Sequence, residues 1–265
     1  MGTSLNVLLI GTGRVAFHLG HALKVAGVSL VGVVGRSPER TSSMANELNV
    51  PSLVFGSDLP KADVLLIAVS DDAIAPVAAS IPVSDAVVVH TSGASDLDRL
   101  APHVHRGVLW PLMTMSPGLP MDLTAVPMVT DGNTQHAKSV VRNVAQRISS
   151  HVSSLDHADR ELVHTAAALS TNLSLFLLGE AQRLLREAGI DPDLLIPAFR
   201  MMATKAGTVG PEEALTGPAR RGDHGTIERH LDRLARDPDL RRAYALLSNM
   251  ILRTYGHTEH GPADV

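Results

Sequence analysis

A glycine-rich turn near the N-terminus constrains the fold of this 265-residue chain more than any other feature. The apolar run Val7–Ile10 leads into Gly11-Thr12-Gly13-Arg14-Val15-Ala16, after which apolar residues recur at helical spacing. A strand, a Gly-x-Gly-x-x-Ala turn and a helix in this order form a dinucleotide-binding fingerprint: Gly11 permits the tight turn, and Gly13 lets a pyrophosphate approach. The first N–H groups of the helix then face the phosphates. We predict that residues 11–15 bind a dinucleotide; an ordinary strand–helix turn is the alternative.

The end of the second expected strand, Val28–Gly35, indicates which dinucleotide binds. Sites for NAD usually carry an acidic residue here, which bonds the 2′-hydroxyl of the adenosine ribose. This chain has Arg36 and Ser37 instead, with Arg40 one turn later. Guanidinium and hydroxyl groups suit a 2′-phosphate, so we predict NADP as the cofactor. The alternative is that Arg36 is a solvated loop cation.

Strands and helices alternate as far as residue 155. Apolar runs at 64–69, 86–90, 107–115 and 126–130 are each bounded by turn or helix signals, which predicts an α/β fold with a doubly wound parallel sheet. Ligands of such sheets bind at the carboxyl ends of the strands. The candidates for the nicotinamide end of the cofactor are Val69, Ser70, His90, Thr91, Ser92 and Gly93. Ser92 and Gly93 are also candidates for substrate contact. The alternative for His90 is a structural histidine at the edge of the sheet, with its hydrogen bonds satisfied within the protein.

The character of the sequence changes after residue 155. The segment His164–Leu178 is apolar almost all round, which is typical of a helix buried in a core or an interface. Further helices are expected near 194–206, 227–234 and 239–255. We therefore predict a dinucleotide-binding domain over residues 1–155, an all-helical domain over 156–255 and a flexible tail over 256–265.

Polar residues interrupt this long apolar helix. His164 and Asn172 are eight residues apart, about 12 Å along an α-helix, so they can line one cavity without contacting the same substrate atom. Asn172 is a candidate for hydrogen bonding to a carbonyl or to the nicotinamide carboxamide, and His164 for donating a proton to a reduced oxygen or nitrogen. The alternative for both is hydrogen bonding between helices at a domain or dimer interface.

A second polar stretch, Leu215–Thr226, contains three glycines and a proline. It carries Arg220 and Arg221, and an arginine can clamp a carboxylate through two hydrogen bonds. We expect one of them to contact an acidic substrate. Asp223 either shares that contact, pairs with one of the arginines, or caps the helix that begins near Thr226; a purely structural loop is the alternative for the whole stretch.

Composition excludes several other classes of site. The chain has no cysteine, so zinc–thiolate sites and cysteine nucleophiles are absent. Its net charge of −4 is unlike that of most nucleic-acid-binding proteins. The histidines at 103–105 and 257–260 match no zinc template, and we predict no metal site. We see neither a signal sequence nor an apolar run of about 18 residues, so we expect a cytoplasmic protein without a membrane span.

Taken together, these motifs resemble those of one family of oxidoreductases. The resemblance rests on the N-terminal glycine turn, His90–Ala94, Thr171-Asn172 and Gly217-Pro218-x-x-Arg221-Gly222-Asp223. That family pairs a Rossmann-like domain with a helical C-terminal domain of unknown function, and it is more distantly similar to ketopantoate and pyrroline-carboxylate reductases. The resemblance implies that the long helix forms the floor of the active site and that the helical domain forms a homodimer.

The resemblance also implies an activity. The expected reaction is NADP(H)-dependent reduction of a small 2-oxo acid, such as ketopantoate, by hydride transfer. A cyclic imine acid is the alternative substrate, and a non-catalytic NADP-binding sensor or scaffold is the rival class. The chain departs from the family at Trp110, where histidine is expected before Pro111, and at Lys205, where asparagine is expected.

Overall fold

The computed structural model describes residues 5–261. The chain divides into two compact units, Met1–Leu173 and Ser174–Val265, which we describe separately. The domain limits predicted above follow the change in sequence character and stay a prediction.

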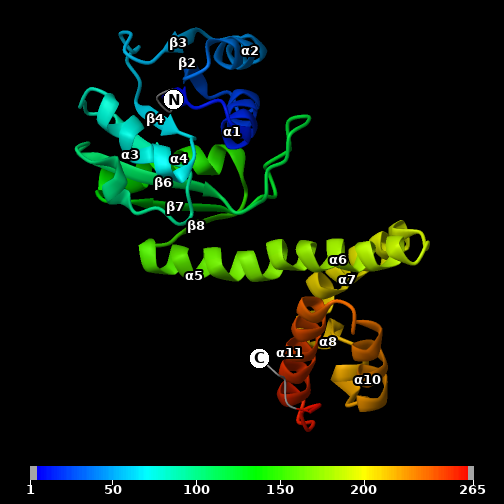
Figure 1. Cartoon of the computed structure of the whole chain (residues 1–265). Helices are drawn as coiled ribbons and strands as arrows, with labels where there is room; N and C mark the ends of the chain where they lie inside the picture. The colour runs from blue at the N-terminus through cyan, green and yellow to red at the C-terminus, as the bar shows by residue number, and fades with distance from the viewer. Residues whose placement is uncertain (1–4, 262–265) are drawn as a thin grey trace. The chain divides into compact units, whose positions relative to one another are not determined.

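The first unit is built on an eight-stranded sheet with the order β3-β2-β1-β4-β5-β6-β7-β8 (Figure 1). The strands are β1 (Asn6–Ile10), β2 (Ser29–Gly35), β3 (Ser52–Val54), β4 (Val64–Ile67), β5 (Val87–His90), β6 (His105–Pro111), β7 (Met128–Gly132) and β8 (Val152–Ser154). The doubly wound α/β fold is confirmed. One detail is corrected: β7 runs antiparallel to β6, whereas every other neighbouring pair in the described sheet is parallel.

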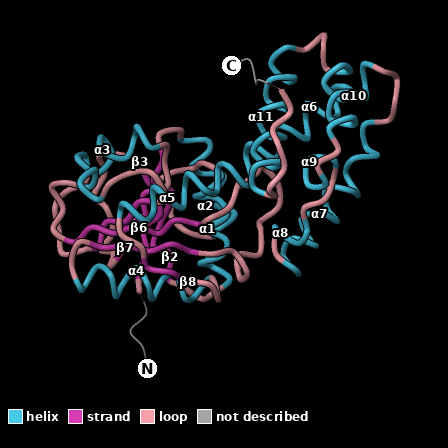
Figure 2. The backbone as a smooth tube through the Cα atoms, turned by 90° about the horizontal axis from the view of Figure 1, so that it is seen from below, coloured by secondary structure: helices cyan, strands magenta, loops and turns pink. Residues whose placement is uncertain are grey.

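Helices cover both faces of this sheet (Figure 2). They are α1 (Arg14–Val25), α2 (Pro38–Leu48), α3 (Asp71–Ser80), the short helix η1 (Leu97–Leu100) and α4 (Gln135–Ile148). Alternate strand residues face opposite layers, as the pleat requires. Leu9 packs in the cluster that contains residues of α1, α2 and α4, whereas Leu8 packs in the one that contains residues of α3 and η1. This burial on both faces explains the unbroken apolar runs of the strands.

The order of the strands fixes where a ligand can bind. The chain moves outward from β1 to β2 and β3, then returns to β4 on the other side of β1. The crossover loops after β1 and β4 therefore leave the sheet in opposite directions and open a crevice at the carboxyl ends of these strands.

A long helix continues across the boundary between the units. It comprises α5 (His157–Ala167), the π turn η2 (Ala168–Asn172) and α6 (Leu173–Glu187). The sequence predicts that the segment His164–Leu178 is buried in a core or an interface; the single chain does not bury it, because Leu169 and Phe176 are at least 60% exposed. Of the two predicted settings, burial in an interface therefore remains, because an exposed apolar helix is typical of an interface.

The same helix bears on the membrane prediction. Over His157–Glu187 it is 31 residues long and contains an 18-residue window with a mean hydropathy of 1.4, so by length and composition it is long and apolar enough to cross a membrane. This differs from the expectation of no such segment. None of the residues in this window is buried in the described structure, whereas the fully buried Arg160 ties the start of the helix to β7.

The second unit is helical throughout its described residues. It contains the rest of α6, η3 (Pro192–Leu194), α7 (Leu195–Val209), α8 (Pro211–Ala214), α9 (Pro218–Arg221), α10 (His224–Arg233) and α11 (Pro238–Thr254). This confirms the predicted all-helical region. Its small core is formed by Ala219, Ile227, Leu231 and Leu252.

The described part of the expected tail, residues 256–261, makes defined contacts with this unit. The N–H of His257 donates to the Leu252 carbonyl (2.8 Å), and that of His260 donates to Asn249 Oδ1 (2.8 Å). The His257 ring also bonds the carbonyl of Arg220 (3.2 Å). Residues 262–265 lie outside the described residues.

Candidate functional site

A cavity of about 820 Å³ lies at the carboxyl ends of β1, β2 and β4. This volume suits a small-molecule ligand. Of the thirteen residues predicted to bind the cofactor, ten line it: Gly11, Thr12, Gly13, Arg14, Val15, Arg36, Ser37, Arg40, Val69 and Ser70. The structure therefore brings three separate sequence segments together around one cleft, which we call the nucleotide cleft.

The glycine turn has the geometry that a phosphate requires. Gly11 has a φ of +124°, and a Cβ there would clash with the carbonyl oxygen of Ala68. A Cβ on Gly13, in contrast, would meet no atom within 4 Å, so the space beside the turn is open. The first turn of α1 carries no acidic side chain. Its N–H groups and the positive end of its dipole favour an anion.

The residues at the end of β2 suit a bound phosphate, and they leave little space for an acidic side chain at residue 35. Ser37 caps α2 by accepting the N–H of Arg40 (3.4 Å). No ion pair in the described part of the chain engages Arg36 or Arg40. At Gly35 a Cβ would clash with Thr41 Oγ1 and lie 2.7 Å from Thr12 Cγ2. The side chains of Thr12 and Thr41 thus occupy the space that an acidic side chain at residue 35, as used by an NAD site, would need.

Phe55 is a lining residue that the sequence did not reveal. The register pairs Gly35 with Val54, so Phe55 follows β3 directly beside Arg36. Its side chain is 39% exposed, and the lining also includes Pro76 and Val77 of α3. The signal was hidden because β3 is only three residues long and carries no alternation that marks a strand.

Four of the predicted residues, at the end of β5 and in the loop after it, do not line the nucleotide cleft: His90, Thr91, Ser92 and Gly93. All four are buried. The N–H of Ser92 donates to His90 Nδ1 (3.2 Å), and Ser92 Oγ accepts the N–H groups of Ala94 (3.2 Å) and Ser95 (3.1 Å). These bonds fix the shape of the loop. Contact of these residues with a cofactor or substrate stays a prediction.

His90 is neutral at physiological pH. Burial, and then the positive charge of Arg160, lower its pKa to about 4. Because Nδ1 accepts a hydrogen bond, the single ring proton is on Nε2. His90 is consequently unsuited to proton donation at pH 7, which leaves His164 as the candidate acid.

Trp110 joins this loop to the long helix. Its ring lies directly against Gly93, where a Cβ would come within 2.5 Å of the indole. The ring of His164 stacks on Trp110 with centroids 5.6 Å apart and an interplanar angle of 18°. The residue that departs from the family pattern thus links Gly93 to His164, two residues that the sequence could not bring together.

Asn172 lies at the end of the π turn. Thr171 Oγ1 donates to the carbonyl of Ala167 (2.6 Å) and to Asn172 Oδ1 (3.2 Å). A π turn has more residues per turn than an α-helix, so the angle between His164 and Asn172 differs from the value expected for an uninterrupted helix. Such turns are frequent at functional sites. The proposed catalytic role of Asn172 stays a prediction.

The residues predicted to bind substrate in the second unit have structural partners. The guanidinium of Arg220 lies 3.6 Å from the ring centroid of Tyr255. Asp223 caps α10 by accepting from the N–H (3.0 Å) and Oγ1 (2.8 Å) of Thr226, and these bonds lower its pKa. The capping alternative is therefore confirmed for Asp223. Arg221 and Lys205 are exposed. Substrate contact by Arg220, Arg221 or Asp223 is not tested by this arrangement.

An open doubly wound sheet, with a glycine turn at its reversal point and a cleft along its strand ends, defines a Rossmann-type nucleotide-binding fold. Residues 2–117 match the family model of the Rossmann-like domain, and residues 126–251 match that of the Domain of unknown function (DUF2520). The two matches together span most of this chain, in agreement with the predicted resemblance.

Solved structures resemble the chain over nearly its whole length. One from Bacteroides fragilis, provisionally named an NADP oxidoreductase, is 28% identical with a TM-score of 0.84, and the match covers 94% of this chain and 98% of the other. A protein from Thermotoga maritima is 21% identical (TM-score 0.77; 95% and 98% covered). A pyrroline-5-carboxylate reductase from Streptococcus pyogenes is 16% identical (TM-score 0.63; 94% and 98% covered). A search of curated proteins finds no match.

Proposed function

We propose that this protein is an NADP(H)-dependent oxidoreductase that reduces a small 2-oxo acid by hydride transfer. The observation that carries the proposal is the nucleotide cleft, where the glycine turn and the free guanidinium groups of Arg36 and Arg40 lie around one cavity. The similarity to the Bacteroides fragilis protein, whose name specifies NADP, supports the same cofactor.

In this proposal the parts of the cofactor are held by different elements. The N–H groups at the start of α1 bind the pyrophosphate. Arg36, Ser37 and Arg40 hold the 2′-phosphate through charge-assisted hydrogen bonds. Phe55 and Pro76 enclose the adenine between apolar surfaces. When bound, the nicotinamide supplies the hydride, and Val69 and Ser70 lie toward that end of the site.

Proton delivery falls to the long helix. His164 is the proposed donor to the oxygen or nitrogen that is reduced, and Asn172 is the proposed hydrogen-bond donor to the substrate carbonyl. The neutral state of His90 agrees with this division, since a histidine with a pKa of about 4 holds almost no acidic proton at pH 7.

The substrate class has one serious alternative. The fold is shared with pyrroline-5-carboxylate reductase and with an imine reductase from Pseudomonas sp. (18% identical, TM-score 0.62), so an imine acid is the second candidate. A non-catalytic NADP-binding sensor would retain the cleft without turnover. The proposal also includes a cytoplasmic homodimer.

Two measurements test the proposal in sequence. Titration with NADPH and with NADH, followed by the fluorescence of the bound reduced cofactor, should show tighter binding of NADPH. NADPH oxidation is then followed against a panel of 2-oxo acids and cyclic imine acids. Failure to bind NADPH overturns the oxidoreductase proposal; binding without turnover of any panel member favours the sensor.

A further inference from the structure

Arg160 is the largest side chain that is completely buried in the described residues. It extends from α5 and forms an ion pair with Asp131 of β7. Its Nη2 also donates to the carbonyl oxygen of Ser95 (3.0 Å) and lies 3.3 Å from His157 Nδ1. The Nε of Arg160 is also buried but has no hydrogen-bond partner among the described residues. A buried guanidinium is tolerated when its charge is paired, and a buried pair of this kind can favour one geometry over others.

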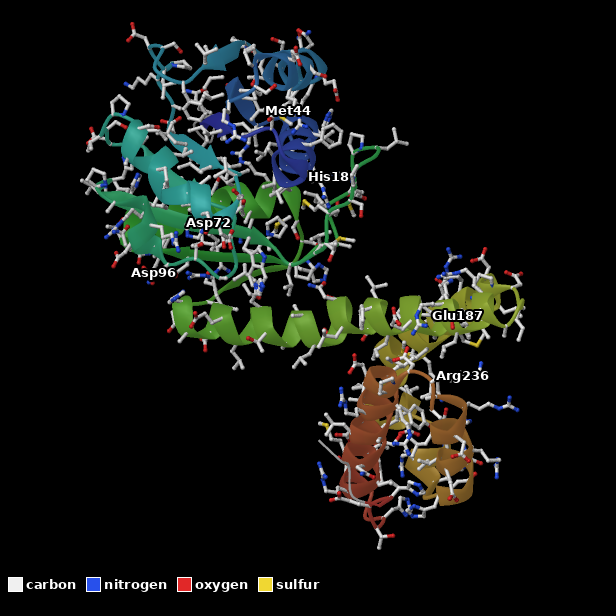
Figure 3. All side chains as sticks on the ribbon, viewed as in Figure 1. His18, Met44, Asp72, Asp96, Glu187 and Arg236 are labelled. Carbon is white, nitrogen blue, oxygen red and sulfur yellow. The ribbon has the colours of Figure 1, made fainter. Side chains whose placement is uncertain are left out.

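The bond to Ser95 connects Arg160 to the loop after β5. Within that loop, residues 92–95 are held together by Ser92 Oγ, which accepts hydrogen bonds from the N–H groups of Ala94 and Ser95. Asp96, which Figure 3 labels, lies 3.7 Å from His157 Nε2 and so adds a second link to α5. One end of α5 is therefore attached to both β7 and this loop.

The same face of α5 carries His164. Positions four apart lie on one side of a helix, so Arg160 and His164 point in the same direction from α5. His164 stacks on Trp110, and Trp110 in turn rests on Gly93 of the loop that Arg160 holds. Arg160 thus closes a ring of contacts that runs through Ser95, Gly93, Trp110 and His164.

From this ring we infer that Arg160 is a positioning residue, which sets the place of the His164 imidazole against Trp110. It acts through its bonds to Asp131 and Ser95 and does not itself contact the reacting groups. This role deepens the proposed function, in which His164 donates the proton, but it can be tested without cofactor or substrate.

The chain contains a single tryptophan, so Trp110 reports on His164 without interference from another indole. A protonated imidazole in contact with an indole quenches its fluorescence, whereas the neutral ring quenches it less. Emission of the full-length protein is therefore recorded from about pH 5 to about pH 8. The variant His164→Gln lacks the stacked imidazole. We define the His164 signal as the pH-dependent change in emission that the wild type shows and that this variant lacks.

Arg160→Lys keeps a positive charge for Asp131 but cannot hold Asp131 and Ser95 in one planar fork. We expect it to lose more than half of the His164 signal while the circular dichroism and melting temperature show a folded protein. Arg142→Lys is the matched control, because Arg142 is exposed on α4 and contacts only Ser154 Oγ (3.4 Å) among described side chains. It should keep the full signal.

If Arg160→Lys does not fold, the double variant Arg160→Met/Asp131→Leu replaces the buried pair by apolar residues, a change that proteins often tolerate. It also lacks the bond to Ser95 and should lose the same signal. A folded variant of either kind with the full His164 signal overturns the inference. Failure of the wild type to bind NADPH would overturn the proposed function alone, since the fluorescence readout needs no cofactor.

Discussion

Gly35 and Arg36 are neighbours at the end of β2, and together they determine the chemistry at the far end of the nucleotide cleft. Gly35 was visible in the sequence only as a missing carboxylate; the structure adds that Thr12 and Thr41 fill the space where its side chain would be. Arg36 and Arg40 could be predicted because the glycine fingerprint fixes the spacing to β2. Phe55 and Arg160 could not, because their roles depend on contacts with segments distant in the sequence.

Replacing Arg36 should separate the two cofactors. Arg36→Ala removes a charge-assisted bond of about 1.5–3 kcal/mol, so NADPH affinity should fall roughly 10- to 100-fold while NADH affinity is unchanged. The measurement is titration by bound-cofactor fluorescence, with Arg147→Ala on the exposed side of α4 as control. An equal loss for NADPH and NADH would show that Arg36 does not bind the 2′-phosphate.

Phe55 should act on the adenine alone. Loss of a base-stacking surface costs about 1–3 kcal/mol, so Phe55→Ala should weaken NADPH and adenosine 2′,5′-bisphosphate by roughly 10-fold and leave reduced nicotinamide mononucleotide unaffected. Calorimetric titration measures all three. Val54→Ala is the control, since Val54 is 54% exposed and does not line the cleft. Unchanged binding of the bisphosphate would place the adenine elsewhere.

His90 should make the first unit sensitive to acid. Its pKa is about 4 in the fold against 6.5 in the unfolded chain, so the unfolded state binds more protons between these values and stability falls as pH falls through 6.5. From pH 7.5 to pH 5 this linkage is worth about 2 kcal/mol. Urea denaturation at both pH values checks it. His90→Asn should show a correspondingly smaller loss, and an unchanged loss would assign the sensitivity to other groups.

Among the secondary-structure elements, those with strong periodicity were predictable and those without it were not. The strands buried on both faces, and the helices capped by Ser37 and Thr134, follow directly from apolar runs and capping residues. The three-residue strand β3 is too short for any pattern. The reversed direction of β7 leaves no trace in side-chain alternation, which is the same for parallel and antiparallel strands. The π turn likewise has no signature in composition.

The connection between α1 and the loop over residues 112–125 gives a prediction at this scale. His18, labelled in Figure 3, is buried and donates Nε2–H to the Ser116 carbonyl (2.9 Å), while Nδ1 accepts the N–H of Met121 (3.2 Å). His18→Leu leaves both groups unpaired, at a cost of about 1–3 kcal/mol. Hydrogen exchange should speed up in residues 112–125 but not in α4. His21→Leu, on the same helix but beside Glu47, is the control; equal exchange in both variants would refute the link.

For the whole molecule, the exposed apolar surface is the feature that the sequence predicts only in part. The apolar character of the long helix was evident, but burial depends on what lies beside it. In the single chain its apolar residues face solvent together with others of the second unit: Leu169, Leu173, Leu175, Phe176, Met201, Met202, Leu246, Leu247 and Met250. Exposed apolar residues in such number are typical of an interface.

We therefore predict a homodimer through the helical region. Light scattering after size-exclusion chromatography should give twice the mass of the 28.0 kDa chain. Charged substitutions on this surface, Phe176→Glu with Met201→Glu, should yield a folded monomer, because desolvating a carboxylate in an apolar interface is unfavourable. Leu119→Glu, at an exposed apolar residue of the first unit, should remain dimeric. A monomeric wild type at micromolar concentration would contradict the prediction.

The crowding around Gly35 bears on attempts to re-engineer the coenzyme preference. Introducing aspartate there to recruit NADH, the usual first step in such redesign, would press the new side chain into Thr12 and Thr41. A library that varies residue 35 alone should therefore return misfolded or inactive clones. A library that also replaces Thr12 and Thr41 by residues with smaller side chains should return folded clones that bind NADH.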